Sequence, residues 1–170
     1  MSVHLKNIIK NLQEFTRKGH EHLEIIILGG IAMEYYGEKN RKTIDLDAEV
    51  KGNIEKLLLF LKKKKIPADI GEDIARWGIV SLPPNYRGKA VSIYKDDALI
   101  IKVLHPLHFV IAKLRRATET DEQDALFVAR KYKLQKKELK LAAQLAIQNS
   151  PKDTALFVFE RAVEHFLNIL

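Results

Sequence analysis

Two aspartates are the residues in this sequence whose type and spacing most plainly could do chemistry. Asp45 and Asp47 lie two positions apart in TIDLDAEV, residues 43–50, where apolar and acidic residues alternate. Alternation of this kind is the period of a strand with one wet face, so both carboxylates are expected side by side on that face. Two such charges repel unless a cation lies between them, and Mg²⁺ binds carboxylate oxygens together with phosphate oxygens. The spacing favours a metal site, with a solvated strand face as the alternative.

A glycine pair precedes these aspartates in the chain. Gly29 and Gly30 follow an apolar run, residues 23–28, that is typical of a buried strand, and they precede a short predicted helix over residues 31–36. Glycines at such a turn let the backbone approach a ligand closely, and the amide groups at a helix N-terminus favour an anion. The turn predicts a phosphate site, with a tight connection that binds no ligand as the alternative. Together, the turn and the two carboxylates predict a site for a nucleoside triphosphate (NTP) chelated to Mg²⁺.

This arrangement resembles the polymerase-β-like nucleotidyltransferase superfamily, in which a strand, Gly-Gly and a helix are followed by Arg-x-Thr-x-Asp-x-Asp. The matching residues are Gly29, Gly30, Arg41, Thr43, Asp45 and Asp47. A second group is similar to the lysine, basic cluster and D-x-x-D of the small bacterial and archaeal branch that includes AbiEii-type toxins. Its members are Lys113, Arg115, Arg116, Asp121 and Asp124. The resemblance covers residues 23–133.

The resemblance implies a role for each matching residue of the first motif. Asp45 and Asp47 would be catalytic carboxylates that bind Mg²⁺, in a site that allows two metal ions. The glycine pair would hold the triphosphate. Arg41 and Thr43 would complete the nucleotide-binding group, although Arg41 could instead pair with a neighbouring acid.

The resemblance also implies catalytic roles for the second group. Lys113 would neutralise phosphate charge, and Asp121 or Asp124 would orient Lys113 or assist the incoming group. Each has a structural alternative. Lys113 could be a surface lysine of an amphipathic helix, and the two aspartates could simply stabilise the first turn of a helix, where acids complement the helix dipole.

The chain departs from the superfamily pattern at two places. Gly-Gly stands where Gly-Ser is usual, so a serine hydroxyl contact to phosphate is missing. A third carboxylate usually lies on a later strand, whereas the predicted strand 99–104 carries Lys102. Asp96 and Asp97, in the preceding turn, are then the remaining candidates for that carboxylate.

The elements that would position these residues indicate an α/β (α+β) fold, with a mixed sheet flanked by helices and a C-terminal helical bundle. We expect an α/β core over residues 1–104, in which residues 54–65 and 69–77 are helices, residues 86–89 are a loop, and residues 91–94 and 98–104 form a hairpin. Residues 105–170 are expected to form three helices packed on the core, the middle one opening at Thr120 and the last at Ser150.

Composition excludes several classes of function. The 170 residues contain no cysteine, so disulfides and thiolate chemistry are excluded, and no P-loop motif appears. No apolar run approaches the ~20 residues that span a bilayer, so we expect a soluble cytoplasmic protein with no membrane partner. The formal charge is +7. Lys62 to Lys65 are expected to complement a helix dipole and aid solubility, whereas the basic strip over residues 111–140 suits a polyanionic partner.

The sequence is therefore consistent with three functions. The first is Mg²⁺-dependent transfer of a nucleotidyl group from an NTP to a hydroxyl of RNA, such as tRNA, or of a protein. The second is a catalytically inactive relative that acts by binding, for example with an antitoxin protein in a toxin–antitoxin pair. The third is an RNA-binding module without a nucleotide pocket.

Overall fold

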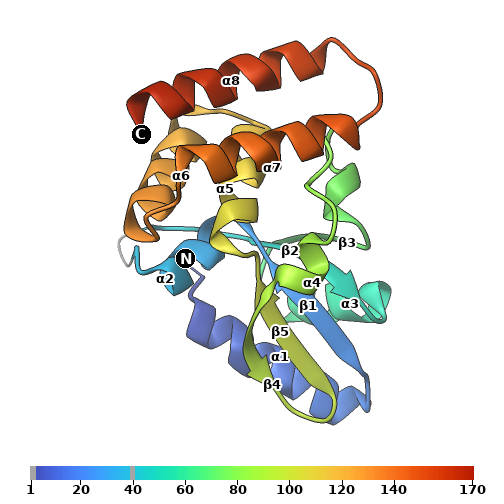
Figure 1. Cartoon of the computed structure of the whole chain (residues 1–170). Coiled ribbons are helices and arrows are strands. Elements are labelled where there is room, and N and C mark those ends of the chain that lie inside the picture. Colours follow the sequence, from blue (N-terminus) through green and yellow to red (C-terminus); the bar gives the residue numbers. More distant parts are fainter. Residues whose placement is uncertain (1–2, 39–40) are drawn as a thin grey trace. The chain divides into compact units, whose positions relative to one another are not determined.

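The computed structural model describes residues 3–38 and 41–170 and divides into two compact units. The first unit lies within Met1–Ile74 and Ala90–Val103, and the second within Ala75–Lys89 and Leu104–Leu170. The chain therefore leaves the first unit, enters the second, and returns before it finishes the first, as the colour gradient of Figure 1 traces.

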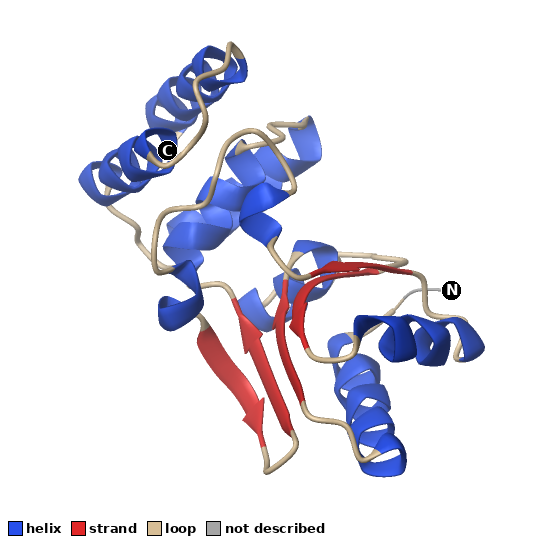
Figure 2. Cartoon of the chain, turned by 90° about the vertical axis from the view of Figure 1, so that its right-hand side faces the viewer, coloured by secondary structure: helices blue, strands red, loops and turns tan. Residues whose placement is uncertain are grey.

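A mixed five-stranded sheet forms the centre of the first unit (Figure 2), with the strand order β3-β2-β1-β5-β4. β1 is antiparallel to β2 and parallel to β5, β3 is parallel to β2, and β4 forms the expected hairpin with β5. The strands are β1 (Leu23–Ile27), β2 (Leu46–Lys51), β3 (Ala68–Gly71), β4 (Val91–Lys95) and β5 (Leu99–Val103). β1 is buried on both faces, as a central strand must be, which explains its continuous apolar run.

Three helices accompany this sheet, and each contacts it: α1 contacts β5, α2 contacts β2, and α3 contacts β3. They are α1 (Leu5–Gly19), α2 (Gly29–Tyr36) and α3 (Ile54–Lys63). In α1, Ile8, Leu12 and Phe15 recur at helical spacing and are buried, which orients that helix on the core. The α/β fold class is thus confirmed.

Two expectations about this unit are wrong. Residues 69–77 are not a helix: β3 pairs with β2, and only the 3₁₀ turn η1 (Ile74–Arg76) follows. The reason is non-local, because backbone partners on β2 satisfy residues 68–71 as a strand. β2 begins at Leu46 instead of Thr43, so Asp45 lies in a bend directly before the strand.

Helices make up the regular structure of the second unit. They are α4 (Tyr86–Lys89), α5 (Pro106–Leu114), α6 (Glu119–Lys131), α7 (Lys136–Gln148) and α8 (Ala155–Ile169). The expected loop at residues 86–89 is therefore a short helix, and four helices follow residue 105 where three were expected. The missed break lacks glycine and proline: Lys133 adopts a left-handed conformation (φ 53°), and a capping box between Gln135 and Glu138 starts α7.

The helix starts of this unit also differ from the sequence prediction. Thr118, rather than Thr120, caps α6, because its hydroxyl accepts a hydrogen bond from the Asp121 amide (3.2 Å). The last helix is preceded by Thr154 and not by Ser150, whose hydroxyl instead donates to the Ala146 carbonyl (2.7 Å) at the end of α7. None of the helices in the described part of the chain is long and apolar enough to cross a membrane.

Candidate functional site

The turn between β1 and α2 brings Gly29 against Asp47. The Leu28 amide donates to the Asp47 carbonyl (2.8 Å), which fixes the turn beside the start of β2. Gly29 has a left-handed backbone (φ +59°), and a Cβ atom at this position would lie 2.0 Å from the Asp47 Oδ2 atom. Only glycine meets both conditions. The Asp47 carboxylate thus lies beside the N-terminal turn of α2, where the helix dipole favours negative charge.

Gly30, Thr43 and Asp45 form the adjoining part of this group. A Cβ atom on Gly30 would lie 2.7 Å from the Thr43 Cβ atom, so the second glycine lets the buried threonine approach. The Thr43 hydroxyl donates to Asp45 Oδ1 (3.2 Å). Asp45 is therefore positioned by a threonine that contacts the glycine turn, rather than by the strand alternation expected from the sequence.

Arg41 is the remaining residue of the first predicted motif. It is half-buried and lies two positions before Thr43, on the irregular segment that leads into β2. The structure thus gathers Gly29, Gly30, Thr43, Asp45 and Asp47, which we call the glycine–aspartate group, within the first unit.

A further carboxylate, which the sequence analysis missed, lies on the neighbouring strand. Asp69 of β3 is the register partner of Asp47, and partners on paired strands project from the same face of the sheet. Asp69 is exposed. The available signal was the short alternating segment Ala-Asp-Ile-Gly after Pro67, which is typical of a strand bounded by turn residues.

The other candidates for a third carboxylate do not reach the glycine–aspartate group. Lys102 of β5 donates to the Glu24 carboxylate, and this hydrogen bond lowers the pKa of Glu24. Asp96 accepts hydrogen bonds from the Tyr94 hydroxyl (2.6 Å) and the Leu99 amide (2.7 Å), so it serves the β4–β5 turn. That turn adjoins the first residue of β1, whereas Gly29 lies at the other end of the strand, two residues after Ile27.

The donor set of the glycine–aspartate group fits a magnesium ion only in part. Asp45 and Asp47 supply hard oxygen ligands, the type that Mg²⁺ prefers. Within residues 3–38 and 41–170, however, no three His, Asp or Glu side chains form a group that could hold a metal by themselves. A cation here would need further oxygen ligands, which a triphosphate or water supplies.

Lys113 and its two aspartates form a buried cluster in the second unit. The Lys113 Nζ atom donates to Asp121 Oδ1 (3.0 Å) and Asp124 Oδ2 (2.8 Å). Only 5% of Lys113 is exposed, so it is not the surface lysine that was the alternative. Arg116 adds hydrogen bonds to both oxygens of Asp121 (2.8 and 3.1 Å). Two cations thus face two carboxylates, and both aspartates accept hydrogen bonds from the Lys113 ammonium group.

Asp121 is held in its charged form. Burial by itself would raise the pKa of Asp121, but hydrogen bonds from Arg116, Thr118 and Lys113 outweigh it and lower the pKa to about 2. A carboxyl group with a depressed pKa stabilises the fold fully above its unfolded pKa, about 3.9, and this stabilisation is lost as the pH falls through the folded pKa.

We therefore expect the difference in unfolding free energy between the wild type and Asp121→Asn to be constant above pH 5 and to shrink between pH 4 and pH 2. Urea titrations at stepped pH measure it, with Asp153→Asn, at an exposed position of the same unit, as the control. A difference that stays constant down to pH 2 would contradict the assignment.

Gly29→Ala is expected to destabilise the chain by about 1–3 kcal/mol, because alanine strains the left-handed backbone and its Cβ atom displaces the Asp47 carboxylate. Thermal unfolding measures the effect. Gly19→Ala is the matched control, since the nearest atom there is in the flexible Glu21 side chain at 3.1 Å and the backbone is helical. Equal stability of the two variants would refute the close approach of Asp47 to Gly29.

A match to a known protein family agrees with the motifs. The sequence profile of a family described as "Nucleotidyltransferase of unknown function" (DUF6036) matches residues 3–153. No curated protein matches the chain. A solved structure, that of an antigenic nucleotidyltransferase-like protein from Paracoccidioides brasiliensis, is 16% identical and covers 94% of this chain and 92% of its own, with a TM-score of 0.47. The family match confirms the resemblance to nucleotidyltransferases.

Proposed function

Because the chain belongs to a family of nucleotidyltransferases of unknown function, we propose that it binds an NTP with Mg²⁺ at the glycine–aspartate group and transfers a nucleotidyl group. The acceptor would be a hydroxyl of RNA or of a protein. The observation that carries this proposal is the approach of the Asp47 carboxylate to Gly29, where a Cβ atom would lie 2.0 Å from its oxygen. This approach brings a carboxylate, the type of side chain that Mg²⁺ prefers, and a helix N-terminus, which favours anions, to one place.

In this proposal, the α2 N-terminus and the aspartates have separate roles. The first amides of α2 would bind phosphate oxygens, since that helix end carries partial positive charge. Asp45 and Asp47 would hold Mg²⁺, with Thr43 fixing the Asp45 carboxylate through its hydroxyl. When bound, Mg²⁺ supplies Lewis-acid stabilisation of charge that develops on the phosphoryl oxygens. Asp69, beside Asp47 on the same sheet face, is the candidate for an additional carboxylate.

The transfer itself would need no covalent bond between the protein and the nucleotide. The acceptor hydroxyl oxygen attacks the α-phosphorus, the bond to pyrophosphate breaks, and the hydroxyl proton passes to solvent. Holding the reactants in line accounts for most of the rate in such reactions, together with electrostatic stabilisation of the transition state. The close packing of the glycine turn against Thr43 and Asp47 would support that alignment.

Two measurements test the proposal. Thermal unfolding with Mg²⁺ and each NTP in turn should show a rise in melting temperature for at least one nucleotide. Incubation with α-³²P-labelled NTPs and either total RNA or total protein should then label one acceptor class. Absence of both the thermal shift and the label would refute the proposal. RNA binding that weakens with salt and survives Asp45→Asn/Asp47→Asn would instead favour an RNA-binding module.

One observation favours a second candidate, a nucleotide-binding protein without transferase activity. β5 contributes Lys102, paired with Glu24, where a third carboxylate is usual in this superfamily. A thermal shift with Mg²⁺–NTP without any labelled acceptor would support this candidate over the enzyme.

A further inference from the structure

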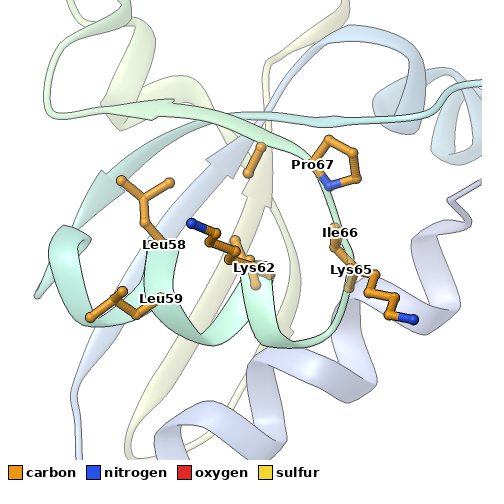
Figure 3. A pocket seen from close by; sticks show the side chains of 8 residues that line it. Leu58, Leu59, Lys62, Lys65, Ile66 and Pro67 are labelled. Carbon is orange, nitrogen blue, oxygen red and sulfur yellow. The ribbon is translucent and has the colours of Figure 1, made fainter.

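A groove of about 450 Å³ lies on the first unit between the C-terminal half of α3 and the segment that leads into β3. Its volume is within the range of ~300–1,000 Å³ typical of binding pockets. Figure 3 shows the side chains that line it, among them Leu58, Leu59, Lys62, Lys65, Ile66 and Pro67. The groove is separate from the glycine–aspartate group, because Ala68 lines it and faces the opposite side of the sheet from Asp69 and Asp47.

The walls of this groove are apolar and accessible. Leu57 and Leu61 are the buried residues of α3 and form its inner face. Leu58 and Leu59 form a second apolar strip on that helix. Leu58 is 40% exposed and Leu59 is 61% exposed. Adjacent exposed leucines beside a groove are typical of a surface that another molecule covers.

The charged side chains that line the groove are all positive. Lys62 and Lys65 line it, and no acidic side chain does. Lys64, one of the two lysines between them in the sequence, differs: its ammonium group pairs with Glu14 Oε2 (2.7 Å) and lies 5.4 Å from the centre of the Phe60 ring. Among the residues that the structure describes, no carboxylate pairs with Lys62 or Lys65. In Figure 3 the ammonium group of Lys62 points toward the leucine side of the groove, whereas that of Lys65 points away from it. Lys62 therefore offers unmatched positive charge beside an apolar floor, and Lys65 adds positive charge at the rim.

We propose that this groove binds an acidic amphipathic helix of a partner protein, with apolar side chains in the groove and Asp or Glu facing Lys62. Charge complementarity selects the carboxylates, and the leucines and Ile66 select apolar side chains spaced three and four residues apart. Nucleic acid fits poorly, because the lining has no aromatic side chain for a base to stack on. A bilayer fits poorly too, because two lysines at ~1 kcal/mol each and one short apolar strip give weak membrane attachment.

Binding of synthetic helical peptides to the full chain tests this proposal without any nucleotide, so its outcome is independent of the proposed transferase activity. One fluorescent peptide carries leucines at i, i+3, i+4 and i+7 with flanking glutamates, and a second carries lysines in place of the glutamates. Fluorescence anisotropy should show binding of the glutamate peptide only. Vesicles of phosphatidylserine and phosphatidylcholine serve as the membrane probe.

Matched variants locate the binding. Lys62→Glu should weaken binding of the glutamate peptide about fivefold, whereas Lys63→Glu, an equal charge change outside the groove on the same helix, should leave it unchanged. Leu59→Ser should also weaken it, and its exposure means that the fold survives the change. Equal binding of both peptides, equal loss in the two lysine variants, or binding to vesicles alone would overturn the proposal.

Discussion

Asp47→Asn is expected to reduce nucleotidyl transfer by about 10²–10³-fold, the range seen when one electrostatic contact to a transition state is removed. Asparagine keeps nearly the same shape, so it can still pack against Gly29, while the negative charge that would hold Mg²⁺ is lost. The folded state should lose only about 0.3–1 kcal/mol, the usual contribution of a carboxylate at a helix N-terminus. Initial rates of label transfer and urea unfolding measure the two effects separately.

Asp97→Asn provides the control for this prediction. It removes the same charge from an exposed position in the β4–β5 turn, at the end of β1 remote from Gly29. Transfer by this variant should match the wild type. An Asp47→Asn protein that transfers label at the wild-type rate would exclude Asp47 from the reaction, whatever its contribution to stability.

Lys113→Met is expected to destabilise the chain by about 3–5 kcal/mol, because removing one partner of a buried ionic group leaves uncompensated charge. Methionine retains much of the length of the lysine stem. The Asp124 carboxylate loses the charge of Lys113, and Asp121 keeps its hydrogen bonds from Arg116 and Thr118. Urea unfolding followed by circular dichroism measures the loss, with Lys140→Met, at an exposed position on α7, as the control.

A double variant separates charge from packing. In Lys113→Met/Asp124→Asn one of the two carboxylates that lost Lys113 is also neutralised, so part of the lost stability should return. No recovery in the double variant would mean that Lys113 acts through its contact with the Phe109 ring (5.5 Å) more than through its charge. A single variant as stable as the wild type would show that the ion pairs contribute little.

The sequence predicted the glycine–aspartate group better than the means by which it is held. Local rules suffice for a glycine turn after an apolar strand and for acids that follow it. They could not show that Thr43 fixes Asp45, because this requires knowing that β2 starts at Leu46. β3 and Asp69 were missed for a related reason. A four-residue strand obtains its hydrogen bonds from a distant partner, and no periodicity within so short a segment records that partner.

In the second unit, too, the sequence pattern did not predict features that depend on tertiary contacts or on backbone conformation. The buried environment of Lys113 follows from α5 packing on α6, a tertiary contact that spacing alone leaves open. The boundary before α7 depends on a left-handed lysine, a conformation for which a sequence prediction would have looked to glycine or asparagine.

The interleaving of the two units along the chain has a consequence for synthesis on the ribosome. β1 is made early, yet its parallel neighbour β5 is made only after residues 75–89, which belong to the other unit. The central sheet therefore cannot form completely until β5 has been synthesised. The long sequence separation between β1 and β5 raises the contact order, and a high contact order slows folding. Residues 75–89 likewise obtain one of their contacts only later in synthesis, since the Ser81 amide donates a hydrogen bond to the Ser150 hydroxyl (2.8 Å). No single cut separates the units, and a nascent chain ending at residue 104 leaves Ser81 without that hydroxyl.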